Sequence, residues 1–361
     1  MSHYEERLEQ DLKKIREHIA AMADKVEDGL KNAVRALQTG DRKLASATIL
    51  SDHPVNRSMR EIDRLCHAFI AVHLPSAGHL RILSSAIRAN IEIERIGDYA
   101  VNIARVSLLL ATPPEGDLGR ELERISSQAQ FMLKQSTTAF NELNAEMARA
   151  TMALEQGMEY DLDSVYAELA ANEDHERVKE LLAVFSVLTQ LKRVADQAKN
   201  LCEETVFAVT GETKAPKVYN ILFIDGDNAC LSQMAEAVVR KTFPGSGHYS
   251  SAGRQPASAL NAAMLQFMEQ HSFDLGGATP SPLSLTHQEL VEQHIIISLQ
   301  GPIKDYFDEL PFHTTGLEWE VGSVPGGEDD PQTTQQLETI YREIAMQVRD
   351  LMETLRGTDA P

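Results

Sequence analysis

Three oxygen-bearing side chains, Glu94, Asp98 and Asn102, lie four residues apart in a stretch with the apolar periodicity of a helix. Four residues advance an α-helix by about 6 Å and return to nearly the same face, so the three side chains form one stripe. Carboxylates at this spacing repel each other, and a bound cation would relieve that repulsion. Oxygen ligands suit Mg²⁺, Ca²⁺, Mn²⁺ and iron. A solvated polar face is the alternative that the spacing leaves open.

A second stripe follows 98 residues later. The positions shared by the two stripes are Arg95, Asp98, Ala100 and Asn102, which recur as Arg193, Asp196, Ala198 and Asn200. Lys192 stands where the first stripe has Glu94, and its ammonium would repel a cation or replace it as the partner of Asp196. We therefore expect the first stripe to bind metal better than the second, with Glu203 and Glu204 one turn further along as partial compensation.

A different chemistry is indicated near the middle of the chain. Residues 220–237 read as an apolar strand, a short loop and a helix. The loop brings together Asp225, Asp227, Asn228, Cys230, Leu231 and Ser232. Backbone N–H groups of such a loop, with the N-terminus of the helix behind it, can hold an anion. Two carboxylates in the loop would repel a phosphate dianion, and a loop packed shut around Leu231 and Cys230 is the simpler alternative.

The surrounding elements predict two architectures. Apolar residues recur every three or four positions through the first 210 residues, which predicts a bundle of antiparallel helices. The expected helices cover about 8–37, 41–73, 77–111, 118–156, 160–171 and 173–209. Beyond a polar linker, strands at 218–224, 295–299 and 317–321, with a short one before 250, alternate with helices at 232–243, 256–270 and 333–356. That order predicts an α/β domain with a small parallel sheet.

Composition narrows the function. The formal net charge of −20 argues against binding to nucleic acid or to an anionic membrane surface. The three cysteines are widely spaced and contain no CxxC, so neither a disulfide framework nor a cysteine zinc site is indicated. The charged residues 1–6 lack the apolar segment of a signal peptide, and no run of about 18 apolar residues exists. We expect a cytoplasmic protein.

The first stripe resembles the signature of the PhoU family, an E(D)xxxDxxxN motif that ends each of two three-helix repeats. Residues 51–56, with Asp52 and Asn56, resemble the Asp…Asn pair on the preceding helix of that family, and residues 75–81 resemble the start of the motif helix. The resemblance covers about residues 1–210. It implies multinuclear metal clusters with Glu94, Asp98 and Asn102 as ligands, and Asp196 and Asn200 at the altered second motif.

The loop after the first strand resembles the anion loop of low-molecular-weight tyrosine phosphatases and related arsenate reductases, over about residues 217–356. Their pattern is Cys, five residues, Arg and Ser. Here Asp225 stands in the nucleophile position and Leu231 in the place of the anion-binding Arg. No Asp precedes Pro325 as the general acid would, and Asp330-Pro331 comes later. Asp225 could act as a carboxylate nucleophile in principle, but the resemblance favours a domain without catalysis.

These readings combine into one expected organisation. We predict a first PhoU-like repeat at 1–112, a second at 115–210, a linker at 211–217 and an inactive phosphatase-like domain at 218–357. The PhoU resemblance implies a negative regulator of phosphate uptake that carries Fe, Mn, Zn or Mg. It also implies contacts with a phosphate transporter ATPase and a sensor kinase, and we expect a homodimer. The alternatives are a phosphate or arsenate sensor and a divergent phosphatase or arsenate reductase.

Overall fold

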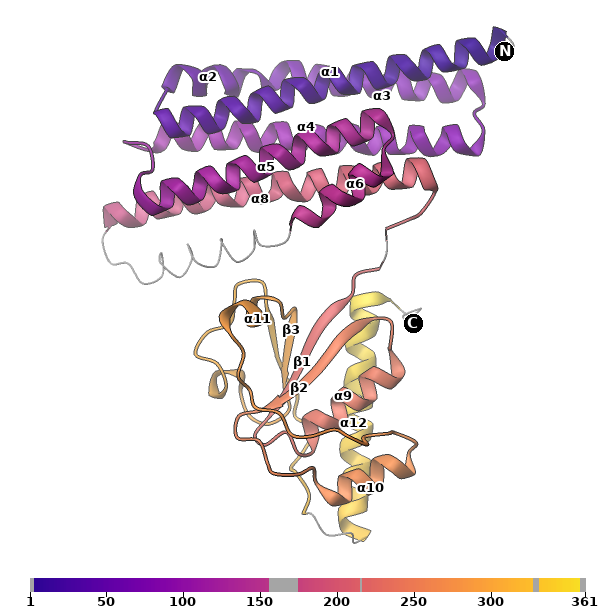
Figure 1. Cartoon of the computed structure of the whole chain (residues 1–361), viewed down its shortest axis with the longest axis vertical. Helices are drawn as coiled ribbons and strands as arrows, with labels where there is room; N and C mark the ends of the chain where they lie inside the picture. The colour runs from indigo at the N-terminus through magenta and orange to yellow at the C-terminus, as the bar shows by residue number, and fades with distance from the viewer. Residues whose placement is uncertain (1–2, 156–174, 215, 327–330, 358–361) are drawn as a thin grey trace. The chain divides into compact units, whose positions relative to one another are not determined.

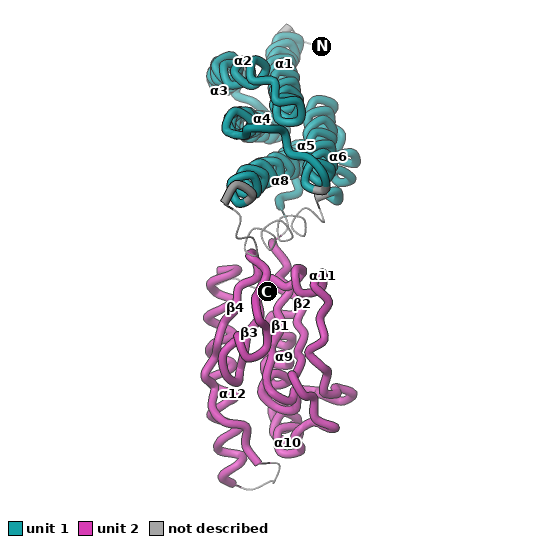
Figure 2. Tube along the Cα trace, turned by 90° about the vertical axis from the view of Figure 1, so that its left-hand side faces the viewer, with its two compact units in different colours: residues 1–214 teal, residues 215–361 magenta. Residues whose placement is uncertain are grey.

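The structure, a computed structural model, describes residues 3–155, 175–214, 216–326 and 331–357. The chain divides into two compact units, residues 1–214 and residues 215–361 (Figure 2). The first is helical and the second contains a parallel sheet, so the expected fold class is confirmed. No helix in the described ranges is both long and apolar enough to cross a membrane.

Long helices packed side by side make up the first unit (Figure 1). The described ones are α1 (His3–Thr39), α2 (Arg42–Leu50), α3 (Asp52–His73), α4 (Ala77–Leu109), α5 (Gly116–Glu142), α6 (Ala145–Met152) and α8 (His175–Thr210), with a short 3-10 turn at Ala153–Glu155. The apolar stripe of α1 lies in the core, where Ile15, Met22 and Leu30 are buried. The helix expected at 160–171 lies outside the described residues.

Two helices that the periodicity predicts as continuous are interrupted in the structure. The expected helix 41–73 breaks at Ser51, because Pro54 has no N–H to donate to the carbonyl of Leu50. The expected helix 118–156 breaks at Leu143, whose φ is 52°, and Asn144 then caps α6 with its side chain. Local backbone chemistry overrides an apolar pattern that runs across both breaks.

The pairing of α4 with α8 joins the two repeats. Arg88 lies against Glu204, and Asn102 lies against Gln190, so residue numbers rise along α4 as they fall along α8. The helices are therefore antiparallel, and the two repeated motifs face each other across the junction. This arrangement carries the motif residues of both repeats onto one pair of helices.

The second unit is built on a four-stranded parallel sheet in the order β2-β1-β3-β4. Its strands are β1 (Tyr219–Asp225), β2 (Gly247–Gly253), β3 (Ile295–Ser298) and β4 (Thr315–Glu318), and its helices are α9 (Leu231–Thr242), α10 (Ala262–Gln270), α11 (His287–Val291) and α12 (Pro331–Arg356), with a 3-10 turn at Ile303–Asp305. The last strand begins and ends earlier than the expected 317–321, and α11 was not expected.

Alternate residues of β1 enter two separate cores, as the twofold period of a strand requires. Ile221 and Phe223 pack with α9, α10 and α12 on one face of the sheet. Leu222 and Ile224 pack on the other face with side chains from the segments after β2 and β3. Both faces of the sheet are therefore covered, and β1 is a buried strand. The loop after β1 lies at the carboxyl end of this strand, which is the edge where parallel sheets bind their ligands.

Two glycines near the candidate sites should respond in opposite ways to replacement by alanine, one with a gain and one with a loss of stability. A Cβ on Gly97 of α4 would lie 3.4 Å from Val55 Cγ1, an ordinary contact, whereas one on Gly253 would lie 2.6 Å from the backbone N of Asn228. We expect Gly97→Ala to stabilise the helical unit by up to about 1 kcal/mol through helix propensity. Gly253→Ala should destabilise the α/β unit by about 1–3 kcal/mol.

Circular dichroism follows the helical unit during thermal unfolding, and fluorescence of Trp319, the single tryptophan of the chain, follows the α/β unit. A lower transition temperature for Gly97→Ala, or an unchanged one for Gly253→Ala, would contradict the packing described for these positions.

Candidate functional site

Carboxylates from two helices gather on the first repeat. Asp52 stands in the first turn of α3, and Glu94 and Asp98 lie on α4. Loss of solvation raises the pKa of Glu94, and the negative charges of Asp98 and Asp52 raise it further. Loss of solvation and the charge of Asp52 likewise raise the pKa of Asp98. The carboxylates of Asp52, Glu94 and Asp98 therefore interact electrostatically, and negative charge is concentrated between α3 and α4.

The two carboxylate oxygens of Asp52 differ in their hydrogen bonding among the described residues. Its Oδ2 accepts a hydrogen bond of 2.7 Å from the Asn56 side chain. Its Oδ1 is buried, and no hydrogen bond from a described residue reaches it. A buried acceptor in this state is costly, and a cation is one group that would satisfy it.

The set fits an oxygen-ligated cation in chemistry but does not form a complete shell. Carboxylate oxygens suit Mg, Mn and Fe ions. Within the described ranges, however, no three His, Cys, Asp or Glu side chains are grouped closely enough to hold one ion. Protein ligands would thus cover part of a coordination sphere, and water or a bridging ion would complete it.

Asn102, the third residue of the first motif, is used elsewhere. Its Nδ2 donates to Gln190 Oε1 of α8 over 3.4 Å, and its Oδ1 accepts from Arg105 over 3.2 Å. Asn200, at the same position of the second motif, contacts Gln197 and donates to Glu92 of α4. In the structure both asparagines serve the α4–α8 junction, and neither is grouped with the carboxylates of α3.

Acidic groups near the second motif are matched by fixed cations. Lys214 lies 2.8 Å from Glu203, and Arg88 lies 3.0 Å from Glu204. Lys192 and Asp196 both take part in interactions of their own. The residues that would precede this motif helix, 156–174, lie outside the described residues. The described part of the second repeat therefore offers less uncompensated negative charge than the first.

The candidate anion loop joins β1 to α9, and Asp225, the last residue of β1, stands at its start. The Asp225 side chain is fully buried. Its Oδ1 accepts from the backbone N–H of Asn228, and its Oδ2 accepts from that of Ser232 over 2.9 Å. Burial raises the pKa of Asp225, and these donors and the Ser232 hydroxyl oppose that rise. The residue in the nucleophile position is thus held inside the loop by the loop's own donors.

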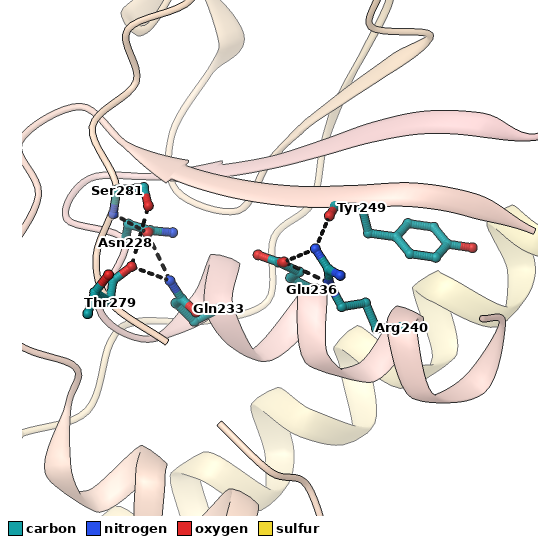
Figure 3. A network of polar contacts seen from close by, with 7 residues as sticks. All are labelled: Asn228, Gln233, Glu236, Arg240, Tyr249, Thr279 and Ser281. Carbon is teal, nitrogen blue, oxygen red and sulfur yellow. Dashed lines mark hydrogen bonds and ion pairs between the residues drawn. The ribbon is translucent and has the colours of Figure 1, made fainter. Parts of the chain in front are cut away.

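Asn228 fixes the shape of the loop from its centre. It has a φ of 52°, in the left-handed region that asparagine tolerates. Its Nδ2 donates to Ser232 Oγ over 2.8 Å. Its Oδ1 accepts from Gln233 and from the backbone N–H of Ser281 (Figure 3). A segment more than 50 residues away is thereby tied to the loop.

The remaining loop residues are either buried or hydrogen-bonded within the loop. Leu231 and Cys230 are fully buried in the apolar core shared with α9. Burial, with Asp225 and Asp227 nearby, raises the pKa of Cys230 to about 12, so this thiol stays protonated and is a poor nucleophile. Asp227 Oδ1 accepts from the backbone N–H of Ala229. Asp330, the later candidate for a general acid, lies outside the described residues.

Three residues absent from the predicted site set contribute to these sites. Glu92 has a pKa raised by burial and receives the Asn200 hydrogen bond. Asp52 was expected only as part of a family-like segment. Gln300, just after β3, accepts from the backbone N–H of Gly226 over 3.0 Å. Its place could have been inferred, because the carboxyl ends of adjacent parallel strands meet at one edge of the sheet.

The fold and these two sites define a class of protein: a helical bundle that bears carboxylates, followed by a parallel-sheet α/β domain with an Asp at the end of its first strand and a Leu at the start of the next helix. Residues 19–107 and 122–205 match the PhoU domain. Residues 220–359 match the low molecular weight phosphotyrosine protein phosphatase family.

Known relatives support this division. The chain is 30% identical over 212 residues to the phosphate-specific transport system accessory protein PhoU homolog of Pseudomonas aeruginosa, covering 58% of this chain and 88% of that protein. It is 26% identical over 204 residues to PhoU of Escherichia coli, covering 56% and 85%. The crystal structure of PhoU from Pseudomonas aeruginosa matches with a TM-score of 0.54 at 30% identity, over 56% of this chain and 99% of that one.

The chain therefore belongs to the PhoU family, and its C-terminal domain resembles the low molecular weight phosphotyrosine protein phosphatases. Both resemblances predicted from the sequence are confirmed.

Because the pKa of Glu94 is raised, replacing it with a neutral residue should increase thermal stability by an amount that depends on pH. Because the folded-state pKa lies above the ordinary value, ionised Glu94 lowers stability at pH 7, and this penalty disappears as the pH falls and the carboxyl is protonated. In metal-free protein, Glu94→Gln should raise the transition temperature at pH 7 by about 2 °C, with little gain near pH 4.

The matched control is Glu123→Gln on α5, where the side chain is exposed. Added Mn²⁺ should reverse the order, stabilising the wild type more than Glu94→Gln. An equal gain for Glu94→Gln at both pH values would show that charge repulsion is not the cause.

Proposed function

We propose that this protein is a metal-binding negative regulator of phosphate uptake, in which a PhoU bundle is joined to a non-catalytic interaction domain. Relatives such as the Pseudomonas aeruginosa protein are phosphate-specific transport system accessory proteins, and the shared region covers most of their length. The observation that carries the proposal is the group of three mutually repelling carboxylates on α3 and α4, in which the buried Oδ1 of Asp52 receives no hydrogen bond from the described part of the chain.

In this proposal Asp52, Glu94 and Asp98 supply part of the ligand shell of Fe, Mn, Zn or Mg, and water or a bridging ion completes it. A bound cation supplies the positive charge that these carboxylates lack and favours their ionised forms. Their mutual repulsion then becomes a shared attraction that fastens α3 to α4. Asp196 and Asn200 form the weaker second site, where Lys192 replaces a carboxylate.

For the C-terminal domain we propose a pseudophosphatase. Attack on phosphorus needs an exposed nucleophile and a cation for the oxyanion. Asp225 is buried and hydrogen-bonded by its own loop, Leu231 contributes no charge, and the Cys230 thiol is protonated. These features favour a domain that binds proteins.

The proposed partners are the ATPase of a phosphate ABC transporter and a phosphate sensor kinase, met in the cytoplasm. The relatives' names place them with a phosphate transport system. A net charge of −20 suits basic faces on protein partners and disfavours nucleic acid. A homodimer is part of the same proposal.

The second candidate function is an oxyanion sensor. It is favoured by the retained loop geometry, in which Asn228 keeps its left-handed conformation and its bond to Ser232. Such a sensor would bind phosphate or arsenate at the loop without turnover, and a third alternative, a divergent phosphatase or arsenate reductase, would transform them.

Elemental mass spectrometry on purified full-length protein tests the metal site. We expect near-stoichiometric metal in the wild type and at least about a tenfold loss of affinity in Asp98→Ala, because one ligand and its charge are removed. Asp196→Ala is the matched control from the second repeat and should retain most of the metal. Sub-stoichiometric metal in all three proteins would leave the acidic group as a solvated polar face.

Hydrolysis of p-nitrophenyl phosphate tests the proposed lack of catalysis. We expect no turnover above the rate of a Ser232→Ala control at any pH between 5 and 8, since neither nucleophile nor Arg is available. Turnover that depends on Ser232 or Asp225 would establish an enzyme and overturn the proposal for this domain.

A further inference from the structure

The backbone N–H groups of the anion loop in the α/β domain already donate hydrogen bonds to acceptors of the chain itself. Asp225 receives the backbone N–H groups of Asn228 and Ser232, together with the Ser232 hydroxyl. Gln300 receives the N–H of Gly226, and Asp227 receives that of Ala229. Each of these acceptors is a side-chain oxygen of the chain itself.

The Ser232 N–H belongs to the first turn of α9, a helix of 12 residues. The N-terminal N–H groups of a helix have no partner within it and favour a negative charge. The residue at the cap position, Cys230, makes no side-chain capping bond. The cap comes instead from Asp225, seven residues before Ser232 and on the preceding strand.

We infer that the Asp225 carboxylate is the resident ligand of this loop: it occupies the donors that would bind an oxyanion and holds the loop in an occupied conformation without any added ligand. This inference rests on the proposed non-catalytic role and deepens it. The chemical class that fits the donors is a small carboxylate or oxyanion, and the chain supplies one covalently.

An external phosphate would compete poorly with this internal group. An intramolecular ligand acts at a high effective concentration and loses little freedom when it binds. The incoming dianion would also meet the charges of Asp225 and Asp227 with no loop cation to offset them. Arg254 lies nearby, but its guanidinium donates to the carbonyl of Asp305 and lies 5.7 Å from the ring of Tyr306.

Removal of the carboxylate should therefore expose a latent anion site. In Asp225→Ala the N–H groups of Asn228 and Ser232 lose their acceptor inside a buried loop, which is a strongly destabilised state. A small anion that enters the vacated space would restore those bonds. Because a ligand that binds only the folded state stabilises it by mass action, the rescue would appear as a rise in transition temperature.

The test is thermal unfolding of the full-length protein, followed by Trp319 fluorescence. Trp319 is the single tryptophan and packs against Phe223 of β1, so it reports on this domain. The probes are sodium formate and sodium phosphate, each compared with sodium chloride at equal ionic strength. We expect Asp225→Ala to unfold at lower temperature than the wild type, and formate to recover about 5 °C or more of the loss.

The two probes separate the sources of the ligand. Rescue by formate alone defines a carboxylate-sized site, and rescue by phosphate as well defines an oxyanion site; both support the inference. The wild type should respond to neither beyond chloride. Asp227→Ala is the matched control, since its partly exposed carboxylate accepts the N–H of Ala229 and not those of Asn228 and Ser232, and it should show no anion-specific rescue.

Two results would overturn the inference. One is a saturable phosphate shift in the wild type, which would mean that the loop donors are open. The other is an Asp225→Ala protein as stable as the wild type and indifferent to formate.

Should Asp225→Ala fail to fold, Asp225→Asn retains the volume of the side chain and one of its two acceptors. We expect it to fold with reduced stability and without formate rescue, and wild-type stability in Asp225→Asn would contradict the role of the charge.

Failure here is distinguishable from failure of the proposed function. A wild type that binds phosphate but does not hydrolyse p-nitrophenyl phosphate would refute the resident ligand and leave the non-catalytic role standing. A wild type that hydrolyses the ester would refute both.

Discussion

A carboxylate withdrawn from water needs a positive partner, and the two domains of this protein meet that constraint in opposite ways. On the bundle, the half-buried Asp52 and Glu94 and the exposed Asp98 repel one another, and the buried Oδ1 of Asp52 receives no hydrogen bond from a described residue. In the α/β domain, Asp225 is more deeply buried, yet backbone N–H groups surround it. The first arrangement favours the binding of an external cation. The second leaves few free N–H donors for an external anion.

The pairing of α4 with α8 makes the first arrangement asymmetric. Both helices carry a copy of the same motif, and the antiparallel contact places each third-position asparagine opposite the other helix. Gln190 is the partner in one case and Glu92 in the other. The two copies of the motif differ in charge, because Lys192 stands where the first copy has Glu94.

Much of this could be read from the sequence, since the relevant signals are local. The apolar stripe that includes Met22 and Leu30 predicts helix α1, and the apolar run at 218–224 predicts strand β1. The recurrence of Asp98 at Asp196 predicts the internal repeat. The strand–loop–helix reading also located Asp225, and its substitution for a nucleophile was predicted. The breaks at Ser51 and Leu143 were missed because an apolar stripe continues across them while the backbone does not.

The contacts of the sites could not be predicted in the same way. Whether Asn102 binds beside Asp98 or crosses to Gln190 depends on the rotation of α4 against α8, which spacing does not encode. Similarly, the sequence places Asp225 in an anion loop, where its charge was expected to repel a ligand. Only the path of the loop shows that its carboxylate turns inward and accepts from Asn228 and Ser232.

The proposed function of both sites is the regulation of phosphate uptake, and the rate of uptake tests it most directly. The measurement is the rate of high-affinity phosphate uptake by phosphate-replete cells of the native host, with the chromosomal copy intact, deleted, or replaced by Asp98→Ala. Deletion is predicted to raise uptake several-fold, and Asp98→Ala is predicted to behave like the deletion. Uptake that stays at the wild-type rate in the deleted strain would contradict the account.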